Sequence, residues 1–174
     1  MEKKRKRALY RSVFLIVSFS IIGITIYLSS FIEDKNALST VGDPAPNFIG
    51  KTLTGEKLEL KEHATEKTLI NFWGTWCEPC KREMPALENV YSQYKDEGFS
   101  IVSVNLGQSN FVVEQFIEQY NLSFPVIIDK DKSIRQAYYV GNLPVSFLIN
   151  SEGEIIKVHE GELSEKMLEE WINL

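Results

Sequence analysis

After residue 40, the hydrophobic positions alternate between short continuous runs and stripes at helical spacing. Two runs, residues 69–73 and 99–106, are apolar on both faces, which is typical of central parallel strands covered by helices. The segment between them carries apolar residues at i, i+3 and i+4 spacing. It predicts an amphipathic helix from about residue 77 to 97, ended by Gly98.

The rest of this region predicts a hairpin before that unit and a second set of elements after it. Leucines alternating with charges around a Thr-Gly turn favour a β-hairpin within residues 48–61. A very short turn at Ser151-Glu152-Gly153 makes the last two strands antiparallel. Together the elements predict one α/β domain, a central mixed sheet flanked by helices on both faces. The later elements are expected as helices at 110–120, 133–139 and 164–172 and strands at 125–129, 145–149 and 154–159.

The N-terminal 32 residues have a different pattern. Residues 12–32 contain no charge, and a helix of this length spans about 31 Å, close to one hydrocarbon core. Six basic residues precede this segment, so the positive-inside bias predicts a cytoplasmic N-terminus and an extracytoplasmic remainder. The competing interpretation is a signal peptide cleaved near residues 37–39. Signal-peptide apolar regions usually run only about 7–15 residues, which favours an uncleaved anchor.

This division organises the chain and its charge. We expect a basic cytoplasmic tail at 1–11, a transmembrane anchor at 12–32, a linker at 33–40 and one folded domain at 41–174. The whole chain has a net charge of −5, but residues 1–32 hold six of the 19 basic and one of the 24 acidic residues. The remainder therefore carries 13 basic and 23 acidic residues, a net charge of −10. Such an acidic domain has no electrostatic footprint for nucleic acid.

Cys77 and Cys80 are the only two cysteines of the chain, and they lie where a predicted strand passes into a predicted helix. A disulfide closing so short a loop removes little chain entropy, so this pair is expected to be reactive rather than structural. A helix N-terminus stabilises a thiolate. Cys77, nearer that terminus, is predicted to be the nucleophile and Cys80 the resolving thiol. Pro79 falls in the first helical turn, where a missing N–H costs little.

Two glutamates near the cysteines are expected to affect the thiols in different ways. Glu78 follows Cys77 directly, so its carboxylate should disfavour the thiolate and keep that thiol less acidic than in a strong oxidant. Glu83 lies three residues after Cys80 on the same helix face and is a candidate acid or base for exchange. The alternative for Glu83 is a solvated residue or an ion-pair partner of Lys81 or Lys67. Spacing alone leaves both interpretations open.

The segment Trp76-Cys77-Glu78-Pro79-Cys80, preceded by Asn71-Phe72-Trp73 and followed far downstream by Leu143-Pro144, resembles the thioredoxin superfamily. Asn71 stands where thioredoxin has a buried aspartate, and Glu83 supplies a carboxylate instead. With the lead-in at 41–46, the extra helix and strand between residues 106 and 129, and the N-terminal anchor, the chain is similar to the ResA-type membrane-anchored thiol-disulfide oxidoreductases of cytochrome c maturation.

The resemblance implies a thioredoxin-like fold and a reductase working in an oxidising compartment. Its substrate would be the disulfide of the Cys-x-x-Cys-His motif in apocytochrome c, and a membrane electron-transfer protein would re-reduce it. No cofactor other than the Cys77–Cys80 disulfide is implied. Pro144 would be cis and would contact the cysteine pair, with backbone near Leu143 docking the substrate. The expected substrate-binding residues are Trp76, Glu78, Pro79, Leu143 and Pro144. Val145 follows this proline where thioredoxin-like chains often have threonine, and this difference bears on the substrate groove rather than on the chemistry.

Other functions compete with this interpretation. The same chemistry would serve a reductase or oxidase of another extracytoplasmic pathway, such as one acting on sporulation proteins. A copper- or zinc-delivery module is the candidate from a different class. Against it, no second cysteine pair exists, and His63 and His159 stand far from Cys77 and Cys80 in the sequence, so no metal site is expected. The surroundings of Cys77 also lack the spacing of a peroxidatic site.

Overall fold

The structure, a computed structural model, describes residues 14–25, 27 and 38–174. The chain divides into two compact units, residues 1–37 and 38–174. In the first unit, residues 14–25 are helical. Within the described residues, no helix combines the length and the apolar character needed to cross a membrane. The predicted tail at 1–11, both ends of the predicted anchor at 12–32 and most of the predicted linker at 33–40 lie outside the described residues.

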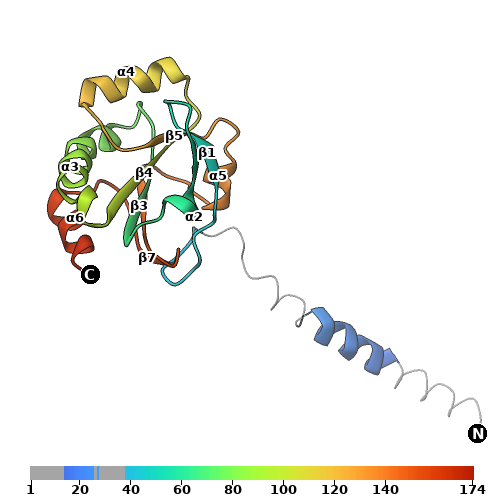
Figure 1. Cartoon of the computed structure of the whole chain (residues 1–174). Coiled ribbons are helices and arrows are strands. Elements are labelled where there is room, and N and C mark those ends of the chain that lie inside the picture. The colour runs from blue at the N-terminus through green and yellow to red at the C-terminus, as the bar shows by residue number, and fades with distance from the viewer. Residues whose placement is uncertain (1–13, 26, 28–37) are drawn as a thin grey trace, which may run out of the picture. The chain divides into compact units, whose positions relative to one another are not determined.

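The second unit is built on a five-stranded mixed sheet with the strand order β5-β4-β3-β6-β7 (Figure 1). Strands β3, β4 and β5 are parallel, β6 runs antiparallel to β3, and β7 runs antiparallel to β6. The predicted parallel pair and the final antiparallel pair are therefore confirmed. The strands are β3 (Lys67–Trp73), β4 (Phe99–Asn105), β5 (Val126–Ile128), β6 (Val145–Asn150) and β7 (Ile155–Glu160).

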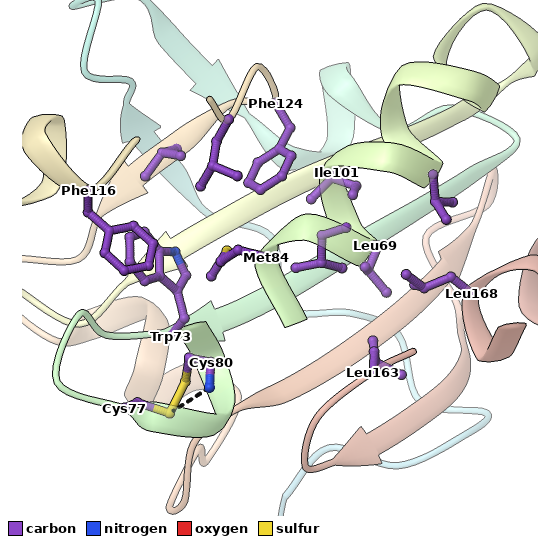
Figure 2. Close-up of a cluster of buried hydrophobic side chains, with 14 of the residues drawn as sticks. Leu69, Trp73, Cys77, Cys80, Met84, Ile101, Phe116, Phe124, Leu163 and Leu168 are labelled. Atoms are coloured by element: carbon purple, nitrogen blue, oxygen red, sulfur yellow. Dashed lines mark hydrogen bonds between the residues drawn. A yellow bond between two sulfur atoms is a disulfide. The ribbon is translucent and has the colours of Figure 1, made fainter. Parts of the chain in front are cut away.

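Helices cover both faces of this sheet, as the apolar runs predicted. On β3, Leu69 and Trp73 enter one buried cluster and Ile70 and Phe72 enter the other, because successive side chains point to opposite faces. The first cluster takes side chains from helices α3, α4 and α6 (Figure 2), and the second from α2 and α5. These helices are α2 (Leu60–His63), α3 (Glu78–Tyr94), α4 (Asn110–Tyr120), α5 (Ser133–Ala137) and α6 (Glu165–Ile172).

Local sequence signals explain where the elements begin and end. Ser109 and Ser164 cap α4 and α6, each accepting a hydrogen bond from the backbone three residues on. The long helix closes with a 3₁₀ turn, η1 (Lys95–Glu97), and Gly98 then adopts a φ of 84°, which is open to glycine. The hairpin is shorter than predicted, β1 (Ile49–Lys51) and β2 (Lys57–Glu59). It ends there because Leu60 is buried in the second cluster as the first residue of α2.

Candidate active site

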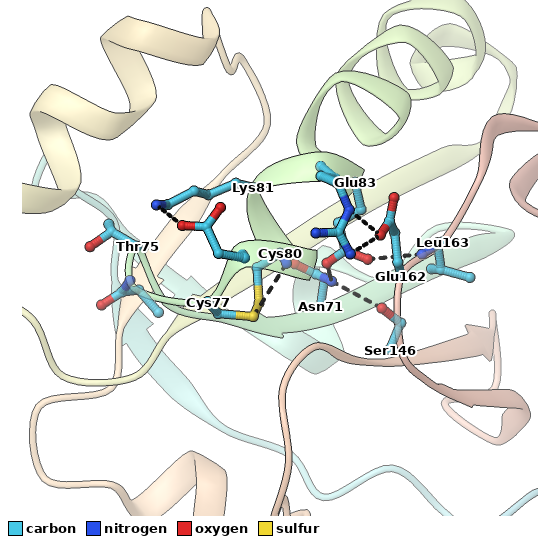
Figure 3. The surroundings of a disulfide bond; sticks show 12 residues. Asn71, Thr75, Cys77, Cys80, Lys81, Glu83, Ser146, Glu162 and Leu163 are labelled. Carbon is cyan, nitrogen blue, oxygen red and sulfur yellow. Dashed lines mark hydrogen bonds and ion pairs between the residues drawn. A yellow bond between two sulfur atoms is a disulfide. The ribbon is translucent and has the colours of Figure 1, made fainter.

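Cys77 and Cys80 form a disulfide at the junction between β3 and α3 (Figure 3). Cys77 is the N-cap of α3, and its Sγ accepts a hydrogen bond from the backbone N–H of Cys80 at 3.2 Å. Cys77 retains 8% exposure, whereas Cys80 is completely covered. The less covered cysteine therefore lies at the positive end of the helix, where a thiolate is stabilised. This geometry agrees with Cys77 as nucleophile and Cys80 as resolving thiol.

Glu83 lies one turn beyond Cys80 and is fully buried. Its Oε1 accepts a hydrogen bond from Nδ2 of Asn71 at 2.9 Å, and its Oε2 accepts one from the backbone N–H of Leu163 at 3.0 Å (Figure 3). Lys81 pairs instead with Glu78, and Lys67 donates to the carbonyl of Ile172. The interpretation of Glu83 as a solvated residue or a lysine partner is therefore wrong.

Burial raises the pKa of Glu83 to about 7, from an ordinary value of 4.5. The negative charge of Glu162 acts in the same direction, while the hydrogen bonds from Leu163 and Asn71 partly oppose the rise. A carboxyl with a pKa near neutrality both accepts and releases a proton at physiological pH. Its position one turn from Cys80 suits it to proton exchange with that thiol.

The raised pKa makes the stability of the folded chain depend on pH. The folded state holds the Glu83 proton more tightly than the unfolded chain, so the stabilising contribution is complete below about pH 4.5 and is lost by about pH 7. Between pH 4 and pH 8 the wild type should lose about 3 kcal/mol in unfolding free energy through this group, and Glu83→Gln should not. Urea denaturation of the wild type and of Glu83→Gln, both with the disulfide intact, at pH 4 and pH 8 measures this change. A difference in unfolding free energy between the two proteins that is the same at both pH values would contradict the assignment.

We expect Glu78 to be less effective against the thiolate than its sequence position predicted. Its carboxylate is exposed and forms an ion pair with Nζ of Lys81 at 2.5 Å, one turn along α3. The hydrogen bond and positive charge of Lys81 lower the pKa of Glu78. Because this ammonium accompanies the carboxylate, the charge that Cys77 experiences from Glu78 is partly cancelled.

Trp76 is the large apolar side chain next to Cys77, and it is 58% exposed. Its ring lies over Gly74, where an added Cβ would approach the indole to 2.7 Å. Glycine at position 74 therefore lets the indole rest against the backbone while one face remains open to a partner. This arrangement is compatible with the predicted substrate-binding role of Trp76, which stays a prediction.

Gly74→Ala is expected to displace the Trp76 indole, because real Cβ atoms do not approach other atoms so closely. We expect a severalfold lower kcat/KM for a protein disulfide and little change for a small organic disulfide, since Cys77 itself is untouched. Steady-state kinetics with both substrates measure the difference. Gly141→Ala is the matched control, because a Cβ there meets no atom within 4 Å. Equal losses for both substrates would contradict a role for the indole in protein recognition.

Gln108 is a site residue that the sequence reasoning missed. Its Oε1 accepts from the backbone N–H of Thr75 at 2.8 Å, and its Nε2 donates to Oγ1 of Thr75 at 2.7 Å. Asn105 at the end of β4 donates to the same Oε1. These bonds hold the turn that leads into Trp76 and Cys77. The available signal was topological: the carboxyl ends of the parallel strands β3 and β4 lie at one edge of the sheet, so polar residues following both strands meet there.

The peptide bond between Leu143 and Pro144 is cis, as the resemblance implied. Val145 pairs with Phe72, which places Pro144 at the end of the sheet where β3 leads toward the cysteines. The Pro144 carbonyl accepts a hydrogen bond from Gly161 at 2.8 Å. Contact of Pro144 with the disulfide and substrate docking on Leu143, Glu78 and Pro79 stay predictions.

The two histidines occupy different environments. His63 is half-buried, bonds to Oγ of Ser100 at 3.0 Å, and has its pKa lowered by burial. His159 on β7 is the register partner of Ser146 and packs edge-on against Trp171. In the part of the chain that the structure describes, no three His, Cys, Asp or Glu side chains converge on a possible metal position.

Comparison with known proteins agrees with this site. The sequence matches the AhpC/TSA family over residues 41–158. It is 41% identical to the thiol-disulfide oxidoreductase ResA of Bacillus subtilis (strain 168), over 99% of this chain and 95% of that protein. The ResA of Halalkalibacterium halodurans is 43% identical over 98% of this chain and 96% of that protein. The chain belongs to the ResA thiol-disulfide oxidoreductases within the AhpC/TSA family.

Solved structures support the same fold. A putative thiol:disulfide interchange protein DsbE from Chlorobium tepidum superposes with a TM-score of 0.72 at 30% identity, covering 79% of this chain and 97% of that one. StoA from Bacillus subtilis superposes with a TM-score of 0.66 at 34% identity, covering 75% of this chain and 98% of that one. The thioredoxin-like α/β fold is thereby confirmed, and the Cys77–Cys80 pair is the redox centre of a thiol-disulfide oxidoreductase.

Proposed function

We propose that this oxidoreductase works as a reductase of protein disulfides, with the Cys-x-x-Cys-His disulfide of apocytochrome c as substrate before haem attachment. The observation that supports reduction rather than oxidation is the buried carboxyl of Glu83 one turn from Cys80. Strong oxidants are those whose reduced, thiolate-bearing form is stabilised. A buried carboxylate beside the thiols has the opposite effect, because it disfavours a second negative charge and so favours giving electrons away.

The chemistry follows from the exposures of the two cysteines and the proton affinity of Glu83. In the reduced protein the Cys77 thiolate attacks a substrate disulfide, forming a mixed disulfide and releasing one substrate thiolate, which takes up a proton. Glu83 accepts the proton of the Cys80 thiol, and the Cys80 thiolate attacks Sγ of Cys77. The second substrate sulfur leaves and takes the proton that Glu83 holds. Two electrons have then moved to the substrate, with one proton from Glu83 and one from solvent, and Cys77–Cys80 is oxidised.

The proposed setting is the extracytoplasmic side of a cell membrane, with the N-terminus cytoplasmic and residues 12–32 as a single anchor. The support is the uncharged 12–32 segment behind six basic residues. Disulfides form readily outside the cytoplasm, so a reductant there needs electrons from elsewhere. A membrane thiol-disulfide electron-transfer protein is the proposed donor.

The redox potential of the full-length chain in mild detergent tests the direction of reaction. A reductase should titrate near the thioredoxin value of about −270 mV, and an oxidant near about −120 mV. A value close to the oxidant end would overturn the proposed reduction.

Substrate identity is tested by trapping. Cys80→Ser removes the resolving thiol, so the mixed disulfide at Cys77 should persist on cell extraction and contain c-type cytochrome precursors. Recovery of other extracytoplasmic proteins alone would assign the enzyme to another pathway.

A further inference from the structure

A line of polar side chains crosses the sheet beneath α3. Ser103 on β4, Asn71 on β3, Ser146 on β6 and His159 on β7 are successive register partners. Register partners point to the same face, and Asn71 shares its face with the buried apolar residues of β3 under α3. Ser103, Asn71 and Ser146 are completely buried. Buried polar groups cost free energy unless they are hydrogen-bonded, so each of these side chains is expected to have a hydrogen-bond partner.

Only one end of the Asn71 carboxamide has hydrogen-bond partners. Nδ2 donates to Oε1 of Glu83 at 2.9 Å and to Oγ of Ser146 at 3.0 Å (Figure 3). The buried Oδ1 of Asn71 has no partner among the described residues, and the same holds for Oγ of Ser103 on the neighbouring strand. The two unpaired groups therefore belong to residues that stand side by side in the sheet.

The observed hydrogen bonds favour the ionised form of Glu83. Both carboxylate oxygens face N–H donors, one from Asn71 and one from the backbone of Leu163. A protonated Glu83 has an O–H that needs an acceptor, and a donor on either oxygen then opposes it. The Leu163 group is a backbone amide and can only donate. A carboxamide presents a donor and an acceptor of nearly equal shape, and its terminal torsion is broad and roughly two-fold.

We propose that the Asn71 carboxamide turns by half a rotation when Glu83 takes up a proton, so that Oδ1 accepts the Glu83 O–H and the NH₂ group moves toward Ser103. Ser146 can follow this change, because its hydroxyl accepts from Nδ2 in one state and donates to Oδ1 in the other. Oγ of Ser103 has no partner among the described residues and does not reach Oδ1 in the observed state. In the rotated state its hydroxyl turns toward Asn71 and accepts the displaced NH₂ group. Asn71 is thus a positioning residue that gives Glu83 a partner in both protonation states. This inference rests on the proposed role of Glu83 in moving protons.

Charged or titratable groups come from several of the elements packed around Glu83, and the charge of Glu162 acts on it directly. Glu162 comes from the segment between β7 and α6 and is bound by Arg82 of α3 at 2.7 Å. His159 comes from β7, and its Nε2 lies 3.5 Å from where a Cβ on Gly161 would stand. Glu165 of α6 is engaged with Asn89, and β3 and β6 contribute only the uncharged Asn71 and Ser146. The thiols titrate only after reduction, so the disulfide form isolates Glu83.

The test is nuclear magnetic resonance of the full-length disulfide form in mild detergent, in a His159→Gln background that removes the neighbouring imidazole. The side-chain carboxyl ¹³C shift of Glu83 reports its titration, and nuclear Overhauser contacts of the Asn71 NH₂ group report its direction. Above the midpoint these contacts should be to the β protons of Ser146, and below it to those of Ser103. An NH₂ group that keeps its Ser146 contacts while Glu83 titrates would overturn the rotation.

A variant away from Glu83 gives a second, independent readout. Ser103→Ala removes the group that receives the rotated NH₂, so it should disfavour protonated Glu83 and lower its midpoint by about half a pH unit. With a fixed carboxamide, Ser103 has no connection to Glu83 and the midpoint stays unchanged, which would contradict the proposal. Ser92→Ala, on the exposed side of α3, is the matched control. Failure of the proposed function has a different signature: Glu83→Gln then leaves the exchange kinetics unaltered, whatever Asn71 does.

Discussion

The Cys77→Ser variant is expected to lose disulfide reductase activity completely. Of the two cysteines, Cys77 is the one that retains some exposed surface, and its sulfur caps the positive end of α3. A serine hydroxyl neither ionises near neutral pH nor forms a disulfide, and Cys80 is fully covered. The rate of reduction of a protein disulfide, with dithiothreitol as electron source, measures the loss.

Cys80→Ser separates this role from that of the resolving thiol. This variant keeps Cys77 and should still attack, stopping as a stable mixed disulfide with stoichiometric release of one substrate thiol. Both variants lack the Cys77–Cys80 bond, so loss of the disulfide alone cannot explain a difference between them. Rapid formation of a mixed disulfide by Cys77→Ser would reverse the assigned roles of the two sulfurs.

The fold was largely predictable because its strongest signals are local. The doubly buried runs at β3 and β4 require covering on two faces, and the short turn before β7 leaves only an antiparallel pairing. The helix ends follow from Ser109, Ser164 and Gly98. The errors lie at the hairpin, where burial of Leu60 in a helical turn replaced the end of the second strand. Tertiary burial overrode a strand pattern there.

The site was predictable in its residues but not in its contacts. The spacing of Cys77, Cys80 and Glu83 places them at the start of one helix, which sequence shows directly. Burial of Glu83 depends on the amide of Leu163, 80 residues away, and the sequence does not reveal which loop covers the helix. Gln108 was missed for the same reason, since its bonds to Thr75 span 33 residues. Such contacts are set by the packing of elements rather than by local pattern.

The Glu83→Gln variant is expected to slow the resolving step by about 10²-fold or more, the usual worth of a positioned general base. Glutamine keeps the shape of the side chain but cannot accept the Cys80 proton. Because burial holds the pKa of Glu83 at about 7, the wild-type rate of resolution should rise through that pH as the carboxyl ionises. The variant should lack this inflection, and the titration of Cys77 should shift because a neighbouring negative charge is gone.

Stopped-flow tryptophan fluorescence of the reduced full-length protein, mixed with a protein disulfide between pH 5 and pH 9, measures both effects, since Trp76 adjoins the reacting sulfur. Glu114→Gln on the exposed face of α4 is the matched control, and its profile should overlie that of the wild type. An unchanged inflection near pH 7 and an unchanged Cys77 titration in Glu83→Gln would exclude the carboxyl from proton transfer. The inflection would then have to belong to another group, and the two cysteines alone would account for the chemistry.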